Sequence, residues 1–176
     1  MWVYNIMMSK YTQKSGKWIY QPNQTIPFRL SRTRIEMFLD CPRCFYLANR
    51  LGLGRPSMPG FSLNTAVDEL LKKEFDLLRK SGQTHELMKQ YGIEAIPFSH
   101  PDMDKWRENF VGISFLHPET NLEIFGAVDD VWINKNNELI IVDYKSTSTQ
   151  EEISLDSEYK QAYKKQMEVY QWLFKK

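Results

Sequence analysis

The sequence predicts an α+β fold in which helices flank a mixed central sheet. Apolar residues recur at three- and four-residue intervals over 31–50, 63–79 and 158–174, which is the period of helices with one buried face. Residues 122–133 and 138–145 are instead rich in β-branched and aromatic side chains, which favours two strands. A helix buries its apolar stripe, and a sheet its apolar face, by packing against another layer. An α/β/α arrangement is therefore expected.

The stretch 31–50 is expected to form two helices rather than one. Ser31 precedes the first apolar stripe and is a favourable N-cap. Pro42 cannot continue a helix without losing a hydrogen bond, but it can open the next one, which would run toward Arg50. The glycines and prolines of 52–60 predict a loop after it.

The second half of the chain predicts a pair of strands between helices. Residues 83–118 favour two short helices, around 84–91 and 102–110. The strands 122–133 and 138–145 are separated by a short polar turn, so they are expected to run antiparallel. The polar stretch 146–158 predicts a loop before the last helix.

The length of 176 residues fits one domain with an ordinary hydrophobic core. Residues 1–29 predict an N-terminal arm or short strands, and residues 30–176 predict the main domain. No apolar run approaches the roughly 20 residues that a membrane span needs. The N-terminus has no basic start followed by an apolar core, so we expect a cytoplasmic protein without membrane partners.

The net charge of +1 conceals two regions of opposite sign. Residues 1–56 hold nine lysines and arginines against two acidic residues, whereas residues 119–143 hold six carboxylates and one lysine. This division is compatible with a phosphate-binding flank beside a metal-binding centre. Two solvated surfaces of opposite charge are the alternative.

The two cysteines, Cys41 and Cys44, have the spacing of half a zinc or iron–sulfur site. The chain has no second cysteine pair, and its three histidines show no spacing that would complete a site. We therefore expect two buried thiols rather than a self-contained metal centre.

Two aspartates and a lysine lie where the predicted strands could bring them together. Alternation places Asp143 and Lys145 on one face of 138–145, and Asp129 lies among apolar neighbours in 122–133. Two buried carboxylates repel each other unless a cation or a proton separates them, and oxygen ligands suit Mg²⁺ or Mn²⁺. Taken alone, an Asp-x-Lys at a strand end is more often a simple ion pair.

Three short motifs follow one another along the chain: Gly126-x-x-Asp129, Asp143-Tyr144-Lys145 and Gln166-x-x-x-Tyr170. This ordered series resembles the motifs of the PD-(D/E)XK nucleases and is similar to the RecB-type exonucleases and the related CRISPR-adaptation nucleases. Residues 30–46 and 63–69 resemble the start of that domain and its first motif helix. The resemblance covers about residues 30–174 and implies a restriction-endonuclease-like fold.

The resemblance also implies the roles of individual residues. It implies a divalent ion, Mg²⁺ or Mn²⁺, with these ligands: Asp68, Asp129, Asp143 and the backbone carbonyl of Tyr144. Lys145 would orient the attacking water and stabilise charge on the phosphate, while Gln166 and Tyr170 would position the site or the nucleic acid. The implied partner is DNA, with RNA left open, and protein partners would belong to a repair, recombination or CRISPR-related complex.

The chain departs from the family pattern at three points. The family often has histidine at the position of Asp68. Aspartate keeps a possible metal ligand there but offers oxygen instead of nitrogen, so a different metal preference or weaker metal binding is expected. Members with an iron–sulfur cluster use three cysteines beyond the last helix, and this chain has none there, so no cluster is expected. The family pattern usually continues into another strand, so whether the chain is truncated at its C-terminus stays open.

Three functions therefore remain in competition. The first is a metal-dependent deoxyribonuclease of exonuclease type. The second is a catalytically inactive nucleic-acid-binding module with the same fold, and the third is an unrelated α+β interaction domain. Metal binding separates the first from the third, and turnover separates the first from the second.

Overall fold

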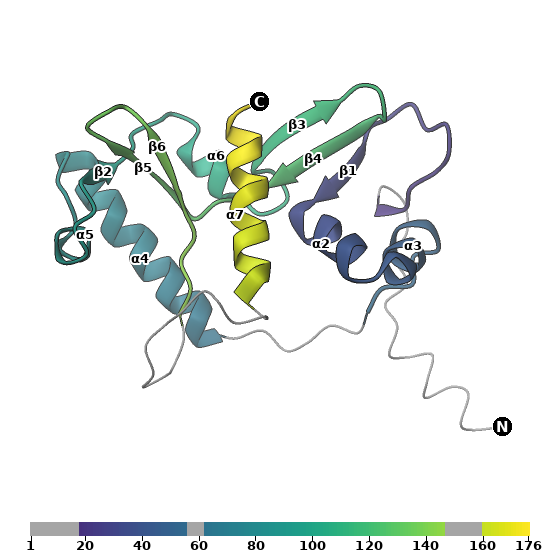
Figure 1. The fold of residues 1–176 in the computed structure, drawn as a ribbon, viewed down its shortest axis with the longest axis horizontal. Coiled ribbons are helices and arrows are strands. Elements are labelled where there is room, and N and C mark those ends of the chain that lie inside the picture. The colour runs from purple at the N-terminus through teal and green to yellow at the C-terminus, as the bar shows by residue number, and fades with distance from the viewer. Residues whose placement is uncertain (1–17, 56–61, 147–159) are drawn as a thin grey trace. The chain divides into compact units, whose positions relative to one another are not determined.

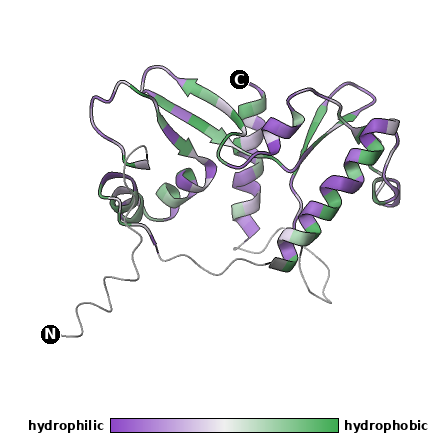
Figure 2. Cartoon of the chain, turned by 180° about the vertical axis from the view of Figure 1, so that it is seen from behind, coloured by the Kyte–Doolittle hydropathy of each residue, from purple (hydrophilic) through white to green (hydrophobic). Residues whose placement is uncertain are grey.

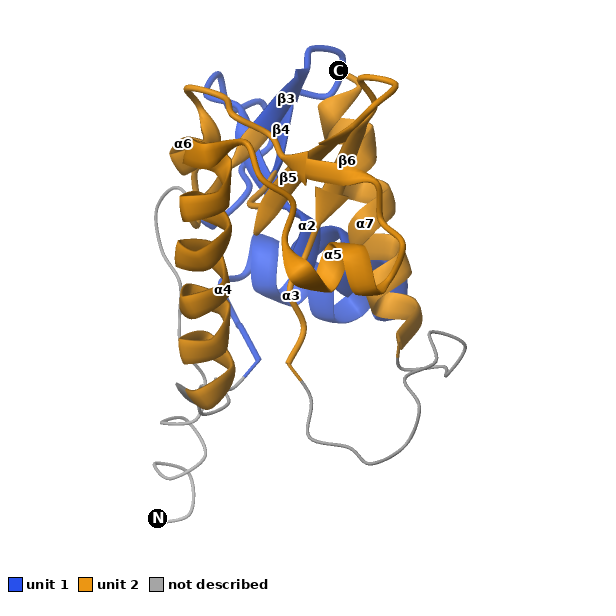
Figure 3. Cartoon of the chain, turned by 90° about the vertical axis from the view of Figure 1, so that its left-hand side faces the viewer, with its two compact units in different colours: residues 1–60, 114–125 blue, residues 61–113, 126–176 orange. Residues whose placement is uncertain are grey.

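A computed structural model describes residues 18–55, 62–146 and 160–176 of the chain (Figure 1). They belong to two compact units, each built from two separate stretches of sequence (Figure 3). The first unit comprises residues 1–60 and 114–125, and the second comprises residues 61–113 and 126–176. The chain therefore passes between the units three times, after residues 60, 113 and 125.

The described residues of the first unit form two helices and a three-stranded sheet of order β1-β4-β3, in which β1 runs parallel to β4. Its elements are β1 (Phe28–Ser31), α2 (Arg32–Asp40), α3 (Pro42–Arg50), β3 (Ile113–His117) and β4 (Leu122–Gly126). As predicted, Ser31 is the N-cap of α2, where its hydroxyl accepts the backbone N–H of Arg34 at 3.4 Å. Pro42 is the first residue of α3, so the predicted division into two helices is confirmed.

The second unit holds an antiparallel sheet of order β2-β5-β6, with α4 and α7 on either side of it (Figures 1 and 3). Its elements are α4 (Ser62–Ser81), α5 (Glu86–Gln90), β2 (Ala95–Pro97), α6 (Met103–Arg107), β5 (Asp130–Asn134), β6 (Leu139–Val142) and α7 (Gln161–Phe174). The α+β class, with helices flanking sheets, is confirmed.

The core of the second unit lies between α4 and one face of the sheet. Phe75 of α4 is 2% exposed and stacks on Trp132 and Tyr144, with ring centroids 5.2 and 5.6 Å apart. Val131 and Ile141 are paired across β5 and β6 and are buried on the other face. Hydrophobic and hydrophilic residues both recur along the whole length of α4, as expected for an amphipathic helix (Figure 2).

The predicted continuous strand over 122–133 is wrong, because two strands from different sheets occupy this range. Between β4 and β5 the backbone forms a hydrogen bond outside the sheets: the N–H of Val128 donates to the carbonyl of Trp106 at 3.1 Å. Gly112, at φ +56°, lies so close to the carbonyl of Gly126 that a Cβ at position 112 would collide with it. This contact joins two separate stretches of the chain, so the strand periodicity of 122–133 could not predict it.

The remaining elements partly match their predictions. The short helices α5 and α6 lie inside the predicted ranges 84–91 and 102–110, whereas β2 and β3 were not predicted at all. The last helix begins at Gln161, and residues 158 and 159 of its predicted range lie outside the described residues, as does nearly all of the predicted loop 146–158. No described helix has both the length and the apolar character needed to cross a bilayer.

Candidate active site

Asp129 lies just before β5 and reaches the end of β6 through its side chain. Its Oδ2 accepts the backbone N–H of Tyr144 at 2.8 Å, and its own N–H donates to the carbonyl of Val142 at 3.3 Å. Tyr144 N belongs to the peptide bond that follows Asp143. The two aspartates of the predicted site are therefore adjacent at one end of the β5–β6 pair.

Asp143 follows β6 and its side chain is 10% exposed. Lys145 forms an ion pair with Asp143 Oδ2, and Gln166 of α7 donates from Nε2 to Asp143 Oδ1 at 2.7 Å. The side chain of Lys145 is 40% exposed, and its ammonium lies 5.4 Å from the ring centre of Tyr163. Lys145 thus keeps access to solvent while Asp143 is held by partners on both oxygens.

Helix α7 supplies the last predicted pair. Gln166 and Tyr170 are both buried, and Gln166 Nε2 also donates to the Tyr170 hydroxyl at 3.1 Å. The Tyr170 ring covers Gly126, where an added Cβ would lie 2.5 Å from Cε1 of the ring. The glycine of the Gly-x-x-Asp motif is therefore needed for the close approach of the tyrosine that ends the last motif.

Lys72 joins the predicted ligand Asp68 to Asp129. Its Nζ lies 2.8 Å from Asp68 Oδ2, one turn earlier on α4, and 2.9 Å from Asp129 Oδ1. Burial lowers the pKa of Lys72, but the two carboxylates raise it by more, so the net shift is upward. Sequence reasoning missed Lys72, although an Asp–Lys pair four residues apart on a predicted helix is a readable signal.

Asp130 has a different environment from its neighbour Asp129. Its side chain is fully buried, pairs with Arg79 and Arg107, and accepts the Tyr144 hydroxyl on Oδ2 at 3.0 Å. Burial and the nearby Asp130 carboxylate raise the pKa of Tyr144 far above its ordinary value. Arg107 also donates from Nε to the carbonyl of Asp129 at 2.8 Å, so this buried cluster fixes the backbone beneath the site.

The carboxylates at this site are candidate ligands for a divalent ion. Across residues 18–55, 62–146 and 160–176, no three His, Cys, Asp or Glu side chains form a group that could hold a metal. Each oxygen of Asp129 and Asp143 has a donor, yet a carboxylate oxygen can accept more than one bond. Asp68 Oδ1 is buried without a hydrogen-bond partner in the described structure. Because Mg²⁺ often uses only one or two carboxylates and keeps several waters, these residues fit such an ion.

The basic first third of the chain is partly engaged within the first unit. Arg29 pairs with Glu123 at 2.9 Å and Arg32 with Glu36 at 2.6 Å. Arg34 is buried, and burial lowers the pKa of its guanidinium. Arg43 and Arg55 are exposed, and the three lysines of the predicted phosphate-binding flank lie outside the described residues.

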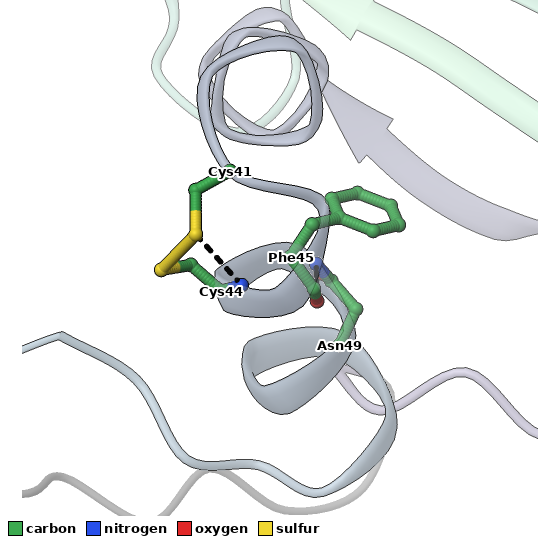
Figure 4. The surroundings of a disulfide bond; sticks show 4 residues. All are labelled: Cys41, Cys44, Phe45 and Asn49. Carbon is green, nitrogen blue, oxygen red and sulfur yellow. Dashed lines mark hydrogen bonds between the residues drawn. A yellow bond between two sulfur atoms is a disulfide. The ribbon is translucent and has the colours of Figure 1, made fainter.

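The expectation of two buried thiols is wrong. Cys41 and Cys44 are joined by a disulfide, and both side chains are half-buried (Figure 4). The reason is local: Cys41 is the single residue between α2 and α3, and the first turn of α3 brings Cys44 beside it.

Comparison with known proteins identifies the family of the chain. No individual curated protein and no solved structure matches the chain. The sequence profile of the PD-(D/E)XK nuclease superfamily, whose members are generally phosphodiester-cleaving hydrolases, matches residues 29–176. That range includes the whole of the second unit and all the residues described above at the ends of β5 and β6. The chain therefore belongs to the PD-(D/E)XK nuclease superfamily.

Proposed function

We propose that this chain is a divalent-metal-dependent nuclease that hydrolyses phosphodiester bonds in DNA, with the RecB-type exonucleases as its functional model. The hydrogen bond from Tyr144 N–H to Asp129 Oδ2 is the observation that carries the proposal. It makes the acidic residues of two separate motifs neighbours at one strand end. DNA is proposed as substrate because the motif order is similar to that of the RecB-type enzymes.

The ion would be Mg²⁺ or Mn²⁺, held by Asp129, Asp143 and the backbone carbonyl of Tyr144. Asp68 is a further candidate ligand, but its Oδ2 is paired with Lys72 at 2.8 Å, so its approach requires Lys72 to move away. When bound, such an ion polarises the scissile phosphate and makes a bound water more acidic.

The side chains around the aspartates have separate roles in positioning the ligands and in stabilising charge on the phosphate. Gln166 donates to Asp143 Oδ1 and so fixes the orientation of that carboxylate. The Lys145 ammonium, paired with Asp143 yet open to solvent, supplies positive charge where a phosphate oxygen becomes more negative. Tyr170 accepts a hydrogen bond from Gln166 and holds the amide in place, which makes both residues of α7 positioning residues in this proposal.

The test is cleavage of labelled linear DNA, circular DNA and RNA with Mg²⁺, Mn²⁺ or EDTA. We expect metal-dependent loss of linear DNA, abolished by EDTA and by Asp143→Asn. The exposed Asp104→Asn is the matched control and should cleave normally. Tight DNA binding without cleavage under any metal would instead favour an inactive binding module, and neither binding nor cleavage would favour an interaction domain.

A further inference from the structure

The Cys41–Cys44 pair plays no part in the proposed nuclease site and lies in the other compact unit. Cys41 is the N-cap of the nine-residue helix α3, and its Sγ accepts the backbone N–H of Cys44 at 3.1 Å (Figure 4). The first turn of α3 contains no acidic residue, and its second residue is the exposed Arg43. Backbone N–H groups at a helix start and nearby positive charge both stabilise a thiolate.

A purely structural role explains this disulfide poorly. Its cysteines are three residues apart, so it closes a very short loop, and the stabilisation from a cross-link grows with the length of the closed loop. The α2–α3 junction also has other contacts. The ring centroids of Phe38 and Phe45 are 5.3 Å apart, and the N–H of Cys41 donates to the carbonyl of Met37 at 2.9 Å. These contacts join α2 to α3 independently of the disulfide.

A metal role also lacks support in the described part of the chain. These are the only two cysteines in the sequence, and the described residues contain no group of three or more metal-binding side chains. His117, the one histidine of the first unit, lies against Thr120 with Nδ1 2.9 Å from its hydroxyl. Both cysteines are half-buried, so each residue keeps part of its surface exposed to solvent.

We infer that Cys41 and Cys44 are a redox-active pair that exchanges between disulfide and dithiol with an external dithiol, such as a small dithiol or a protein with two neighbouring thiols. Reduction begins when a thiolate of the external dithiol attacks Cys44 Sγ. The Cys41–Cys44 bond breaks, and its electron pair leaves on Cys41 Sγ. Cys41 is the better leaving group because the N–H of Cys44 stabilises its thiolate.

In the second step of the exchange the mixed disulfide is resolved. After the first attack, a sulfur–sulfur bond joins Cys44 to the reductant. The reductant's second thiolate attacks its own sulfur in this mixed disulfide and releases Cys44 as a thiolate. The pair has then gained two electrons, the reductant has become a disulfide, and the two protons that its thiols lost are taken up by Cys41 and Cys44.

The test uses the purified full chain equilibrated at a series of ratios of reduced to oxidised dithiothreitol or glutathione. Free thiols are then alkylated and counted by mass spectrometry. We expect the number of alkylated cysteines to change reversibly from none to two as the ratio rises. Two alkylated thiols at every ratio, or none at any ratio, would overturn the inference.

Single substitutions test the assignment of roles. Cys44→Ser leaves Cys41 alone, and Cys41→Ser leaves Cys44 alone, while circular dichroism checks that both variants fold. At neutral pH we expect Cys41 in the first variant to react with an aromatic disulfide roughly tenfold faster than Cys44 in the second. Equal rates, or a faster Cys44, would contradict the assignment of Cys41 as the stabilised thiolate. Neither result depends on nuclease activity.

Discussion

The Nζ atom of Lys72 lies 2.9 Å from Asp129 Oδ1, so a lysine of α4 already supplies a cation to a carboxylate proposed as a metal ligand. The same ammonium contacts Asp68, which makes one positive charge common to two candidate ligands. A divalent ion must therefore bind beside this ammonium or displace it.

We expect Lys72→Met to bind Mn²⁺ about tenfold more tightly, because the variant loses a positive charge and frees acceptor sites on Asp68 and Asp129. The metal-free variant should also be less stable, since the two carboxylates lose their shared cation. Calorimetric titration with Mn²⁺ and urea unfolding measure the two effects. The neighbouring exposed Lys73→Met is the control, and weaker Mn²⁺ binding by Lys72→Met would mean that Lys72 supports the ligands instead of competing.

We expect Asp143→Asn to lose most of its Mn²⁺ affinity while keeping its fold. The asparagine oxygen can still accept the Gln166 amide, but the substitution removes the negative charge that attracts the ion. Calorimetric titration beside Asp104→Asn measures the loss, and circular dichroism checks the fold. Wild-type affinity in Asp143→Asn would exclude this carboxylate as a ligand.

Tyr144→Phe should lower the free energy of unfolding by about 1–3 kcal/mol, because the buried Asp130 carboxylate loses a hydrogen bond from the hydroxyl. Mn²⁺ affinity should not change, since only the backbone carbonyl of Tyr144 is proposed as a ligand. The exposed Tyr91→Phe is the matched control. Loss of Mn²⁺ binding without loss of stability would contradict this assignment.

The raised pKa of Tyr144 also predicts a dependence on alkaline pH. The folded state holds the phenol proton more tightly than the unfolded state, so the stabilisation is fully present below the unfolded pKa of about 10. It is lost as the pH rises above that value toward the higher folded pKa. The stability difference between the wild type and Tyr144→Phe should therefore shrink above about pH 10, whereas a constant difference would contradict the shift.

Much of the arrangement of the candidate site residues could be predicted from sequence, because their motifs depend on local rules. The spacing in Gly126-x-x-Asp129 selected Asp129 rather than Asp130, and the structure gives the two residues different environments. Asp130 is buried between Arg79 and Arg107, which lie 51 and 23 positions before it, so sequence periodicity could not identify its partners. The pairing of Lys72 with Asp68, four residues earlier on one helix, was readable from spacing although it was missed, whereas the contact of Lys72 with Asp129 was not readable.

The limits of the fold prediction have a similar cause. The helices α2, α3, α4 and α7 follow from apolar periodicity, from the N-cap Ser31 and from Pro42 at the first position of α3. The break between β4 and β5 depends on contact between Gly112 and Gly126, and on a hydrogen bond from Val128 to Trp106. These contacts join separate stretches of sequence, so a strand-like composition over 122–133 could not reveal the break.

The single-turnover cleavage rate of Lys145→Ala, measured at saturating Mn²⁺ on end-labelled linear DNA, tests the proposed catalytic centre most directly. Lys145 supplies charge to the reacting phosphate without holding the ion, so the rate should fall on the order of 100- to 1000-fold while Mn²⁺ and DNA affinity stay near wild type. Lys135→Ala, at an exposed lysine of the β5–β6 turn, should cleave normally. Near-normal cleavage by Lys145→Ala would show that its pairing with Asp143 is structural and would contradict the proposed site.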